Sequence, residues 1–123
     1  MADFRLETDR LVLRNWESRD SVPFAEMSAD PVVMAHLDGP IGRAASDAII
    51  TRIKAVQEAQ GHCFWALERK GDGKFLGFCG LRRGGHAGTP VPDELEIGWR
   101  LAHSAWGKGY ALEAVRAAHD WHQ

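Results

Sequence analysis

The chain has 123 residues, of which 45% are hydrophobic and 26% charged, and this length and composition are typical of one globular domain. Its 15 Lys and Arg residues nearly balance 17 Asp and Glu residues, and the formal charge of -2 argues against nucleic acid or an anionic membrane as a partner. No stretch approaches the roughly 20 apolar residues of a membrane span, and the N-terminus lacks the features of a signal peptide, so we expect a cytoplasmic protein.

The first half of the chain predicts β structure followed by helices. Apolar residues alternate with polar ones in residues 4–8 and 11–16, which is typical of one long strand or a bulged pair of strands. Residues 18–29 begin with capping residues and predict a short helix, and residues 32–37 predict a second helical piece. The longest expected helix covers residues 43–60, where apolar residues recur at helical spacing before a glycine ends the run.

The second half predicts three strands and a final helix. Residues 63–69 and 75–81 are expected to pair antiparallel across a Gly-Asp-Gly turn, and residues 94–101 form a third strand. Residues 82–92 contain glycines and two prolines and predict a loop. Residues 109–122 predict a helix with a stripe of small residues suited to close packing on a sheet. The order of elements indicates an α+β domain with a largely antiparallel sheet.

The cysteines, histidines and tryptophans indicate packing rather than chemistry. Cys63 and Cys79 each lie in an apolar run and form neither a disulfide framework nor a metal-ligand pattern, so we expect both in neighbouring strands of the core. His119 and His122 lie one helical turn apart without an evident third ligand, which favours an exposed helix face over a metal site. The five tryptophans lack interleaved basic residues and are expected to be core and packing residues rather than a base-stacking platform.

Two glycines between the last strand and the last helix are the main candidates for ligand binding. Gly107 and Gly109 leave backbone N–H groups unobstructed near a helix start, where an anion such as a pyrophosphate is favoured. A Walker A loop is excluded because Lys108 precedes the second glycine, and the dinucleotide fingerprint is excluded because Leu112 occupies its third glycine position. A tight strand-to-helix turn without a ligand remains the alternative.

Five segments of the chain carry a family resemblance: ETDRLVLR at 7–14, DPVVM at 30–34, FCGL at 78–81, EIGWRL at 96–101 and WGKGYA at 106–111. In their order and spacing, over essentially all of the chain, they resemble the motifs of the GNAT-superfamily acetyltransferases, and within them those of the RimJ/RimL-like branch.

This resemblance implies an acetyl-CoA site and no metal. In the family, the glycine loop binds the coenzyme A pyrophosphate through backbone amides, and the preceding strand pairs with the pantetheine arm. Gly98 is then expected to form a bulge where that strand splays from its neighbour. Trp106 stands where the family usually has Arg or Gln, so one side-chain donor is lost while the amides remain. The implied cofactor-binding residues are Trp99, Arg100, Leu101, Trp106, Gly107, Lys108, Gly109, Tyr110 and Ala111.

The resemblance also implies direct acetyl transfer to a primary amine in a ternary complex. Glu96 matches the position of a carboxylate general base in some members, with Glu94 as the second candidate. The alternative for Glu96 is a strand residue that faces solvent or a cationic neighbour. The acceptor is a protein N-terminus or a small-molecule amine, and a non-catalytic acyl-CoA-binding or regulatory module is the rival function.

Similar acetyltransferases continue beyond the helix that follows the glycine loop. We therefore expect residues 1–123 to form a single GNAT domain that lacks its C-terminal strands, together with the general acid. An unpaired strand edge favours pairing between copies, so the chain is expected to form a homo-oligomer with little activity alone.

Overall fold

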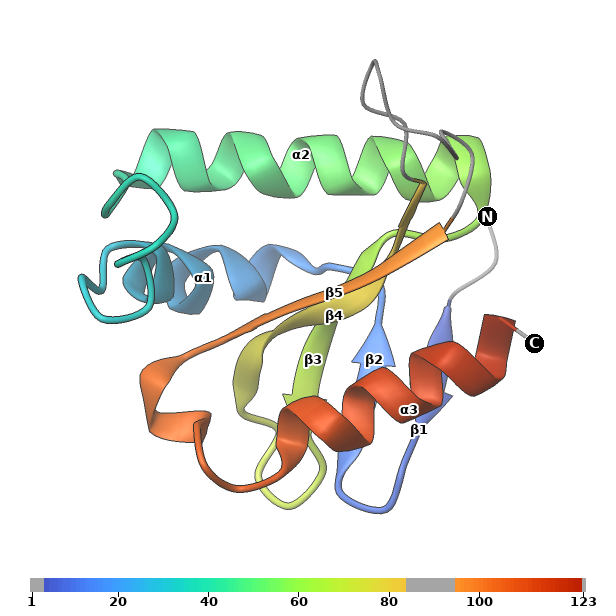
Figure 1. Ribbon diagram of the computed structural model, residues 1–123. Coiled ribbons are helices and arrows are strands. Elements are labelled where there is room, and N and C mark those ends of the chain that lie inside the picture. The colour runs from blue at the N-terminus through green and yellow to red at the C-terminus, as the bar shows by residue number, and fades with distance from the viewer. Residues whose placement is uncertain (1–3, 84–94, 123) are drawn as a thin grey trace.

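An antiparallel sheet forms the centre of the fold, and helices cover both of its faces (Figure 1). The computed structural model describes residues 4–83 and 95–122. Within these residues the sheet has five strands in the order in which they follow along the chain: β1 (Arg5–Glu7), β2 (Leu11–Arg14), β3 (Phe64–Arg69), β4 (Phe75–Arg83) and β5 (Leu95–Leu101). All neighbouring strands pair antiparallel, which confirms the expected α+β fold with a largely antiparallel sheet.

The helices pack on opposite faces of the sheet. Helices α1 (Ser21–Ser28) and α2 (Arg43–Gln60) lie on one face and α3 (Tyr110–His122) on the other (Figure 1). Successive residues of a strand point to opposite faces. Accordingly, Trp65 of β3 contacts Trp121 of α3, whereas Phe78, paired with the next residue of β3, contacts Phe24 of α1. Short 3-10 helices precede α1 and α3, namely η1 (Ser18–Asp20) and η2 (His103–Ala105).

The N-terminal residues form a hairpin, so the expected long strand or bulged pair is wrong. The strands β1 and β2 pair antiparallel, with Leu6 opposite Leu13. The chain reverses because the Thr8 amide donates to the Leu11 carbonyl at 2.9 Å and the Leu11 amide donates to the Thr8 hydroxyl at 3.0 Å. The polar residues between the two apolar runs are therefore a turn.

The segment between α1 and α2 is a series of turns rather than the expected helix at residues 32–37. The Met34 amide donates to the Asp30 carbonyl at 3.0 Å, which closes one helical turn. Farther along the segment, the Gly39 amide donates to the Met34 carbonyl at 3.2 Å. Asp38 and Gly39 adopt positive φ angles of 70° and 85°. This left-handed backbone ends the turns before a regular helix can form.

The longest helix agrees with its prediction. Helix α2 covers Arg43–Gln60, and Gly61 ends it with a positive φ of 76° while its amide donates to the Gln57 carbonyl. A left-handed residue at this position satisfies a free carbonyl of the last turn, and glycine adopts it without strain.

In the second half of the chain, the hairpin of β3 and β4 is confirmed and only the boundaries differ. Strand β4 continues through Arg83, so Arg82 belongs to the sheet rather than to the expected loop. The remainder of that loop and Glu94 lie outside the described residues. Helix α3 begins at Tyr110, and the small residues Ala114 and Ala118 are completely buried against the sheet, as expected.

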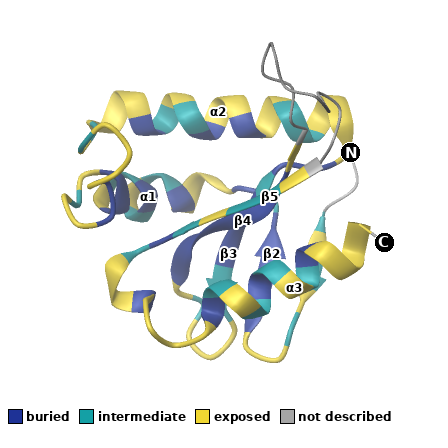
Figure 2. Cartoon of the chain, in the orientation of Figure 1, coloured by how far each residue is buried: buried dark blue, intermediate teal, exposed yellow. Residues whose placement is uncertain are grey.

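Buried side chains fill both sides of the sheet (Figure 2). Both cysteines are buried, and desolvation raises the pKa of each thiol to about 12. Cys79 lies in β4, whereas Cys63 immediately precedes β3. Trp16 and Trp65 are buried as expected. Trp99 and Trp106 are 53% and 46% exposed and lie outside the core, whereas Trp121, although 42% exposed, packs against Phe4 and Trp65 as expected.

Candidate active site

The loop between β5 and α3 is built from two glycines with left-handed backbone. Gly107 has φ of +75° and Gly109 has φ of +81°, a region that side-chain-bearing residues adopt only with strain. The Trp106 indole N–H donates to the Leu101 carbonyl at 2.9 Å, which folds the loop back onto the end of β5. The first amides of α3 have no partner within the helix, so the loop presents N–H donors at its positive end.

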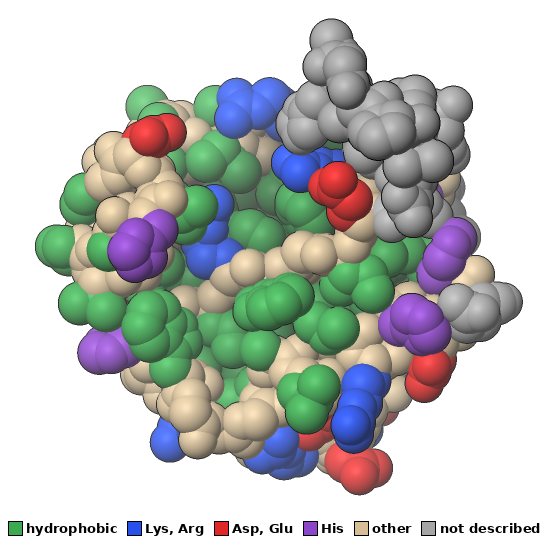
Figure 3. Space-filling view, in the orientation of Figure 1, with side chains coloured by type: hydrophobic (Ala, Val, Ile, Leu, Met, Phe, Trp, Pro, Cys, Tyr) green, Lys and Arg blue, Asp and Glu red, His purple; other side chains and the backbone are tan. Residues whose placement is uncertain are grey.

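A cleft of about 620 Å³ opens between this loop, the end of β5 and the turns that follow α1. The surface is hollowed along β5, with hydrophobic and basic side chains in the depression (Figure 3). Every expected cofactor-binding residue except Lys108 lines the cleft: Trp99, Arg100, Leu101, Trp106, Gly107, Gly109, Tyr110 and Ala111. The structure therefore brings the strand end and the loop to one site.

Lys108 contributes to the loop in another way. It does not line the cleft, and its carbonyl accepts a hydrogen bond at 3.0 Å from Nη1 of Arg10 in the turn between β1 and β2. The Arg10 guanidinium also lies 4.5 Å from the centroid of the Tyr110 ring. The backbone between the two glycines is therefore tied to the N-terminal hairpin.

Glu113, in the first turn of α3, completes this attachment. Its carboxylate accepts hydrogen bonds from the Thr8 hydroxyl, the Arg10 amide and Arg10 Nε. Partial burial alone would raise the pKa of Glu113, but these hydrogen bonds outweigh it and lower the pKa below its ordinary value. Sequence analysis did not predict the cluster of Thr8, Arg10 and Glu113. The one feature of the sequence that pointed to it is that Thr8 and Arg10 belong to the N-terminal motif at residues 7–14.

The outer wall of the cleft was also missed by sequence analysis. It is formed by Val32, Val33, His36 and Leu37 in the turns after α1, and Val32 and Leu37 are 47% and 42% exposed. Exposed apolar side chains around a concave site are typical of a ligand-binding surface. The sequence predicted only a short helical piece at residues 32–37, and a local pattern does not show which side chains line a cleft.

Arg100 lines the cleft together with this wall. Its guanidinium is half-buried, lies 5.2 Å from the centroid of the Phe78 ring and has Nη1 3.8 Å from the Met34 sulfur. Burial lowers the pKa of Arg100. The described residues place no carboxylate in an ion pair with it.

Glu96 is exposed and lies outside the residues that line the cleft. Its Oε2 accepts a hydrogen bond at 2.9 Å from Nη2 of Arg82, which lies opposite it on β4. This is the geometry of a strand glutamate beside a cationic neighbour, and a catalytic role for Glu96 stays a prediction. Glu94 lies outside the described residues.

The bulge expected at Gly98 is absent from the described part of β4 and β5. The two strands pair without a register shift, and Gly98 lies opposite Gly80. A Cβ atom at Gly98 would lie 2.9 Å from Cε1 of Phe64. The glycine therefore makes room for an aromatic ring instead of bending the strand.

The residues that the structure describes contain no group of three or more His, Cys, Asp and Glu side chains placed to hold a metal ion. His119 and His122 are exposed on α3. Within the same described ranges, no helix combines the length and apolarity needed to cross a membrane.

Comparison with known proteins identifies one family. The model of the family described as Acetyltransferase (GNAT) domain matches residues 10–123. The Uncharacterized protein YkkB of Bacillus subtilis (strain 168) is 33% identical over 127 residues, which cover 98% of this chain and 69% of that protein. The Uncharacterized N-acetyltransferase p20 of Bacillus licheniformis is 30% identical over 123 residues, which cover 94% of this chain and 64% of that protein.

Solved structures share the fold. An acetyltransferase from Agrobacterium tumefaciens str. C58 superposes with a TM-score of 0.80 at 27% identity, covering 98% of this chain and 67% of that one. Structures named as RimL, a ribosomal L7/L12 alpha-N-protein acetyltransferase, and as Mycobacterium smegmatis RimJ superpose with TM-scores of 0.76 and 0.67 at 12% and 19% identity. They cover 99% and 96% of this chain and 66% and 59% of their own chains. At such identities the likeness shows the fold alone.

Proposed function

The chain belongs to the GNAT acetyltransferase family, and from this membership we propose that it binds acetyl-CoA in the cleft and transfers the acetyl group directly to a primary amine. The observation that carries the proposal is the convergence of the glycine loop and the end of β5 on one cleft of about 620 Å³. Both segments were expected to bind coenzyme A, and the fold places the turns after α1 beside them to complete the cleft.

The loop suits the pyrophosphate because its binding groups belong to the backbone. Free N–H groups at the start of α3, with the positive end of the helix dipole, favour a doubly charged anion. The left-handed glycines at 107 and 109 keep those groups unobstructed. The side chain of Lys108 lies outside the cleft lining. Lys108 is therefore proposed to bind the pyrophosphate through its backbone rather than through its ammonium group.

The end of β5 suits the pantetheine arm. Strand β5 is the last strand in the order of the described sheet, so no described strand occupies its outer edge. The backbone N–H and C=O groups of an open edge can pair with the amides of an extended ligand, as an added strand does. Trp99, Arg100 and Leu101 line the cleft on this edge.

In the proposed reaction, a neutral amine attacks the carbonyl carbon of the acetyl thioester. A C–N bond forms, a backbone N–H stabilises the oxyanion, and the C–S bond then breaks with transfer of a proton to the thiolate. Glu96 is proposed to take the proton of the amine through a water molecule. The motif position supports this role, whereas its ion pair with Arg82 supports the structural alternative.

The acceptor class follows from the branch that the motifs resemble. We propose a protein N-terminus or a small-molecule amine, as in a RimJ/RimL-like enzyme that acts in the cytoplasm as a homo-oligomer. The order of the motifs supports this placement, and the RimL and RimJ structures support its fold.

Acetyl-CoA turnover with a panel of primary amines, measured beside calorimetric binding of acetyl-CoA, tests the proposal. Formation of an N-acetyl product from at least one amine supports the transferase. Binding of acetyl-CoA with no product even at high protein concentration and long incubation, where a low activity is still detected, would instead support the rival, a non-catalytic acyl-CoA-binding module. Failure of acetyl-CoA to bind would contradict both.

A further inference from the structure

Arg100 differs from Arg14 and Arg69, the other described arginines that are partly or fully buried, because both of those form ion pairs with carboxylates. Arg14 is 4% exposed, and its guanidinium donates to Asp20 at 2.8 Å and to Glu68 at 2.9 Å. Arg10 and Arg82 likewise donate to carboxylates. Arg100 is half-buried, yet its contacts among the described residues are the Phe78 ring and the Met34 sulfur. A sulfur atom is a weak acceptor, and a ring face compensates only part of the lost hydration.

An arginine in this setting retains its charge, because guanidinium groups stay protonated in proteins. Partial removal from water without a paired anion is unfavourable. Burial accordingly lowers the pKa of Arg100, although the group stays charged at neutral pH. A ligand oxyanion that enters the cleft would remove this cost, and the planar guanidinium offers it two parallel N–H donors.

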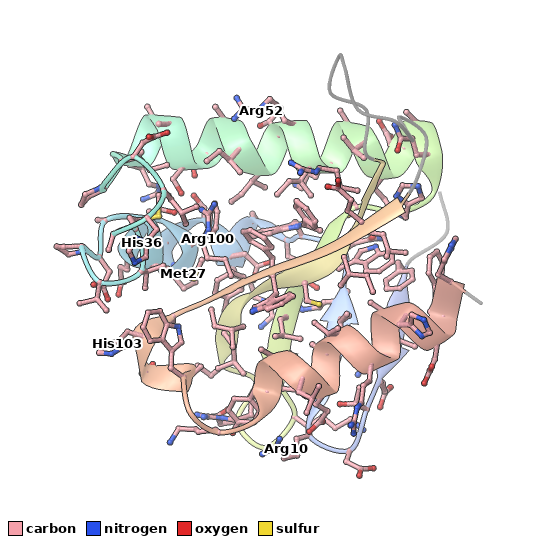
Figure 4. The ribbon with its side chains drawn as sticks, in the orientation of Figure 1. Arg10, Met27, His36, Arg52, Arg100 and His103 are labelled. Carbon is pink, nitrogen blue, oxygen red and sulfur yellow. The ribbon has the colours of Figure 1, made fainter. Side chains whose placement is uncertain are left out.

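The position of Arg100 separates it from the proposed pyrophosphate site. Figure 4 shows its side chain on the side of β5 that faces α1, near His36. His103, at the start of the chain segment that leads to the glycine loop, lies beyond the end of the strand in the same view. Arg100 and His36 both line the cleft.

On the basis of the proposed acetyl transfer, we propose that the acceptor amine also carries an oxyanion, a carboxylate or a phosphate, which the Arg100 guanidinium binds. Acetyl-CoA would pair with the backbone at the edge of β5 and with the loop, whereas the acceptor would approach from the α1 side. The substrate class is therefore an anionic amine, such as an amino acid, a peptide or a phosphorylated amino alcohol, rather than a polyamine.

The test compares acceptors that differ only in the oxyanion. Amino acids and dipeptides are assayed beside their carboxamides, phosphoethanolamine beside ethanolamine, and spermidine serves as the cationic amine. We expect kcat/KM to be roughly tenfold to hundredfold higher for the anionic member of at least one pair, as a charge-assisted hydrogen-bond pair predicts. The carboxylate and phosphate arms show which oxyanion the site accepts. Equal kcat/KM values within every pair would overturn the inference and leave the proposed acetyl transfer intact.

Variants then assign the preference to Arg100. Arg100→Gln should abolish the preference for the anionic acceptor while KM for acetyl-CoA stays within about twofold, and Arg100→Lys should keep part of it. Arg52→Gln is the matched control, because Arg52 is exposed on the outer side of α2 and points away from the sheet (Figure 4). A main effect of Arg100→Gln on KM for acetyl-CoA would place the side chain with the cofactor and overturn the inference.

A binding measurement tests the inference if the chain binds coenzyme A but shows no turnover. The chain loaded with coenzyme A is titrated in a calorimeter with the same amines. Binding of an anionic amine that weakens tenfold or more in Arg100→Gln supports the inference, and binding that is absent or unchanged in the variant overturns it. Failure to bind acetyl-CoA at all would contradict the proposed function instead.

Discussion

Arg10 and Glu113 are joined by two hydrogen bonds although 103 positions separate them in the chain. Arg10 Nε donates to Oε1 of Glu113 at 2.7 Å, and the Arg10 amide donates to Oε2 at 2.9 Å. Since Arg10 also donates to the Lys108 carbonyl, the same residue holds the first turn of α3 and the loop before it. The geometry of the proposed pyrophosphate site therefore depends on the N-terminal hairpin.

Replacing Glu113 by Gln should lower the free energy of unfolding by roughly 1–3 kcal/mol at pH 7, because the hydrogen bonds from Arg10 and Thr8 lose their charged acceptor. The folded-state pKa of Glu113 is lowered, so this stabilisation is present above the ordinary carboxyl pKa of 4.5 and is lost as the pH falls through the lowered value. Urea unfolding of both proteins along a pH series measures the difference. Glu26→Gln, at an exposed position on α1, is the control, and equal stability at pH 7 for wild type and Glu113→Gln would contradict the prediction.

Gly109→Asp should abolish acetyl-CoA binding while the chain stays folded. The new side chain would begin 3.4 Å from Nη2 of Arg10, and its carboxylate would repel a phosphate at the same amides. Calorimetry measures the binding, and circular dichroism measures the fold. Gly61→Asp is the matched control, because Gly61 also has a positive φ but lies at the end of α2 with nothing within 4 Å of a Cβ. Undiminished affinity in Gly109→Asp would exclude the loop as the pyrophosphate site.

Glu96→Gln should reduce turnover by about 10²–10⁴ if this carboxylate is the general base, with acetyl-CoA affinity nearly unchanged. Steady-state kinetics check both effects, with Glu94→Gln in parallel. An equal loss in Glu94→Gln, or no loss in either variant, would assign the base to another residue.

Gly80→Ala should destabilise the fold more than Gly98→Ala. A Cβ at Gly80 would lie 2.0 Å from the Cys63 carbonyl oxygen, which belongs to the backbone, whereas a Cβ at Gly98 meets the Phe64 ring at 2.9 Å. A ring can shift, so we expect a loss of about 1–3 kcal/mol in Gly98→Ala and a larger one in Gly80→Ala. Thermal unfolding ranks the variants. Adding Phe64→Leu to Gly98→Ala should restore part of its loss, and no restoration would show that the ring is not the obstacle.

Strand β5 has no neighbour on its outer edge among the described strands, and Trp99 on this strand is 53% exposed. Open edges with exposed apolar side chains favour pairing between copies. We therefore expect the 123-residue chain to self-associate through this edge, which would compete with the pantetheine arm for the same backbone groups and leave the associated form with little activity. Sedimentation velocity and acetyl-CoA turnover measure the two quantities. A monodisperse and fully active monomer would contradict the expectation.

The sequence by itself determined the features that depend on neighbouring residues. Apolar spacing and a following glycine placed α2 correctly at Arg43–Gln60, and the Gly-Asp-Gly turn indicated the hairpin of β3 and β4. The glycines at 107 and 109 predicted the loop for the same reason, since a left-handed backbone is a property of the residue that adopts it. The loop could therefore be selected as an anion site from its own residues, whereas the strand-end residues proposed for coenzyme A were selected from the family resemblance of the motifs.

Only the tertiary structure decided which distant residues meet. The attachment of Glu113 to Arg10, the wall of Val32 and His36 opposite Arg100, and the packing of Phe64 on Gly98 each join elements far apart in the chain. Nothing in the local pattern distinguishes a glutamate that binds a hairpin turn from one that faces water, or a glycine that bends a strand from one that accommodates a ring. These outcomes depend on which sheet face and helix end pack together, and packing is a property of the whole chain.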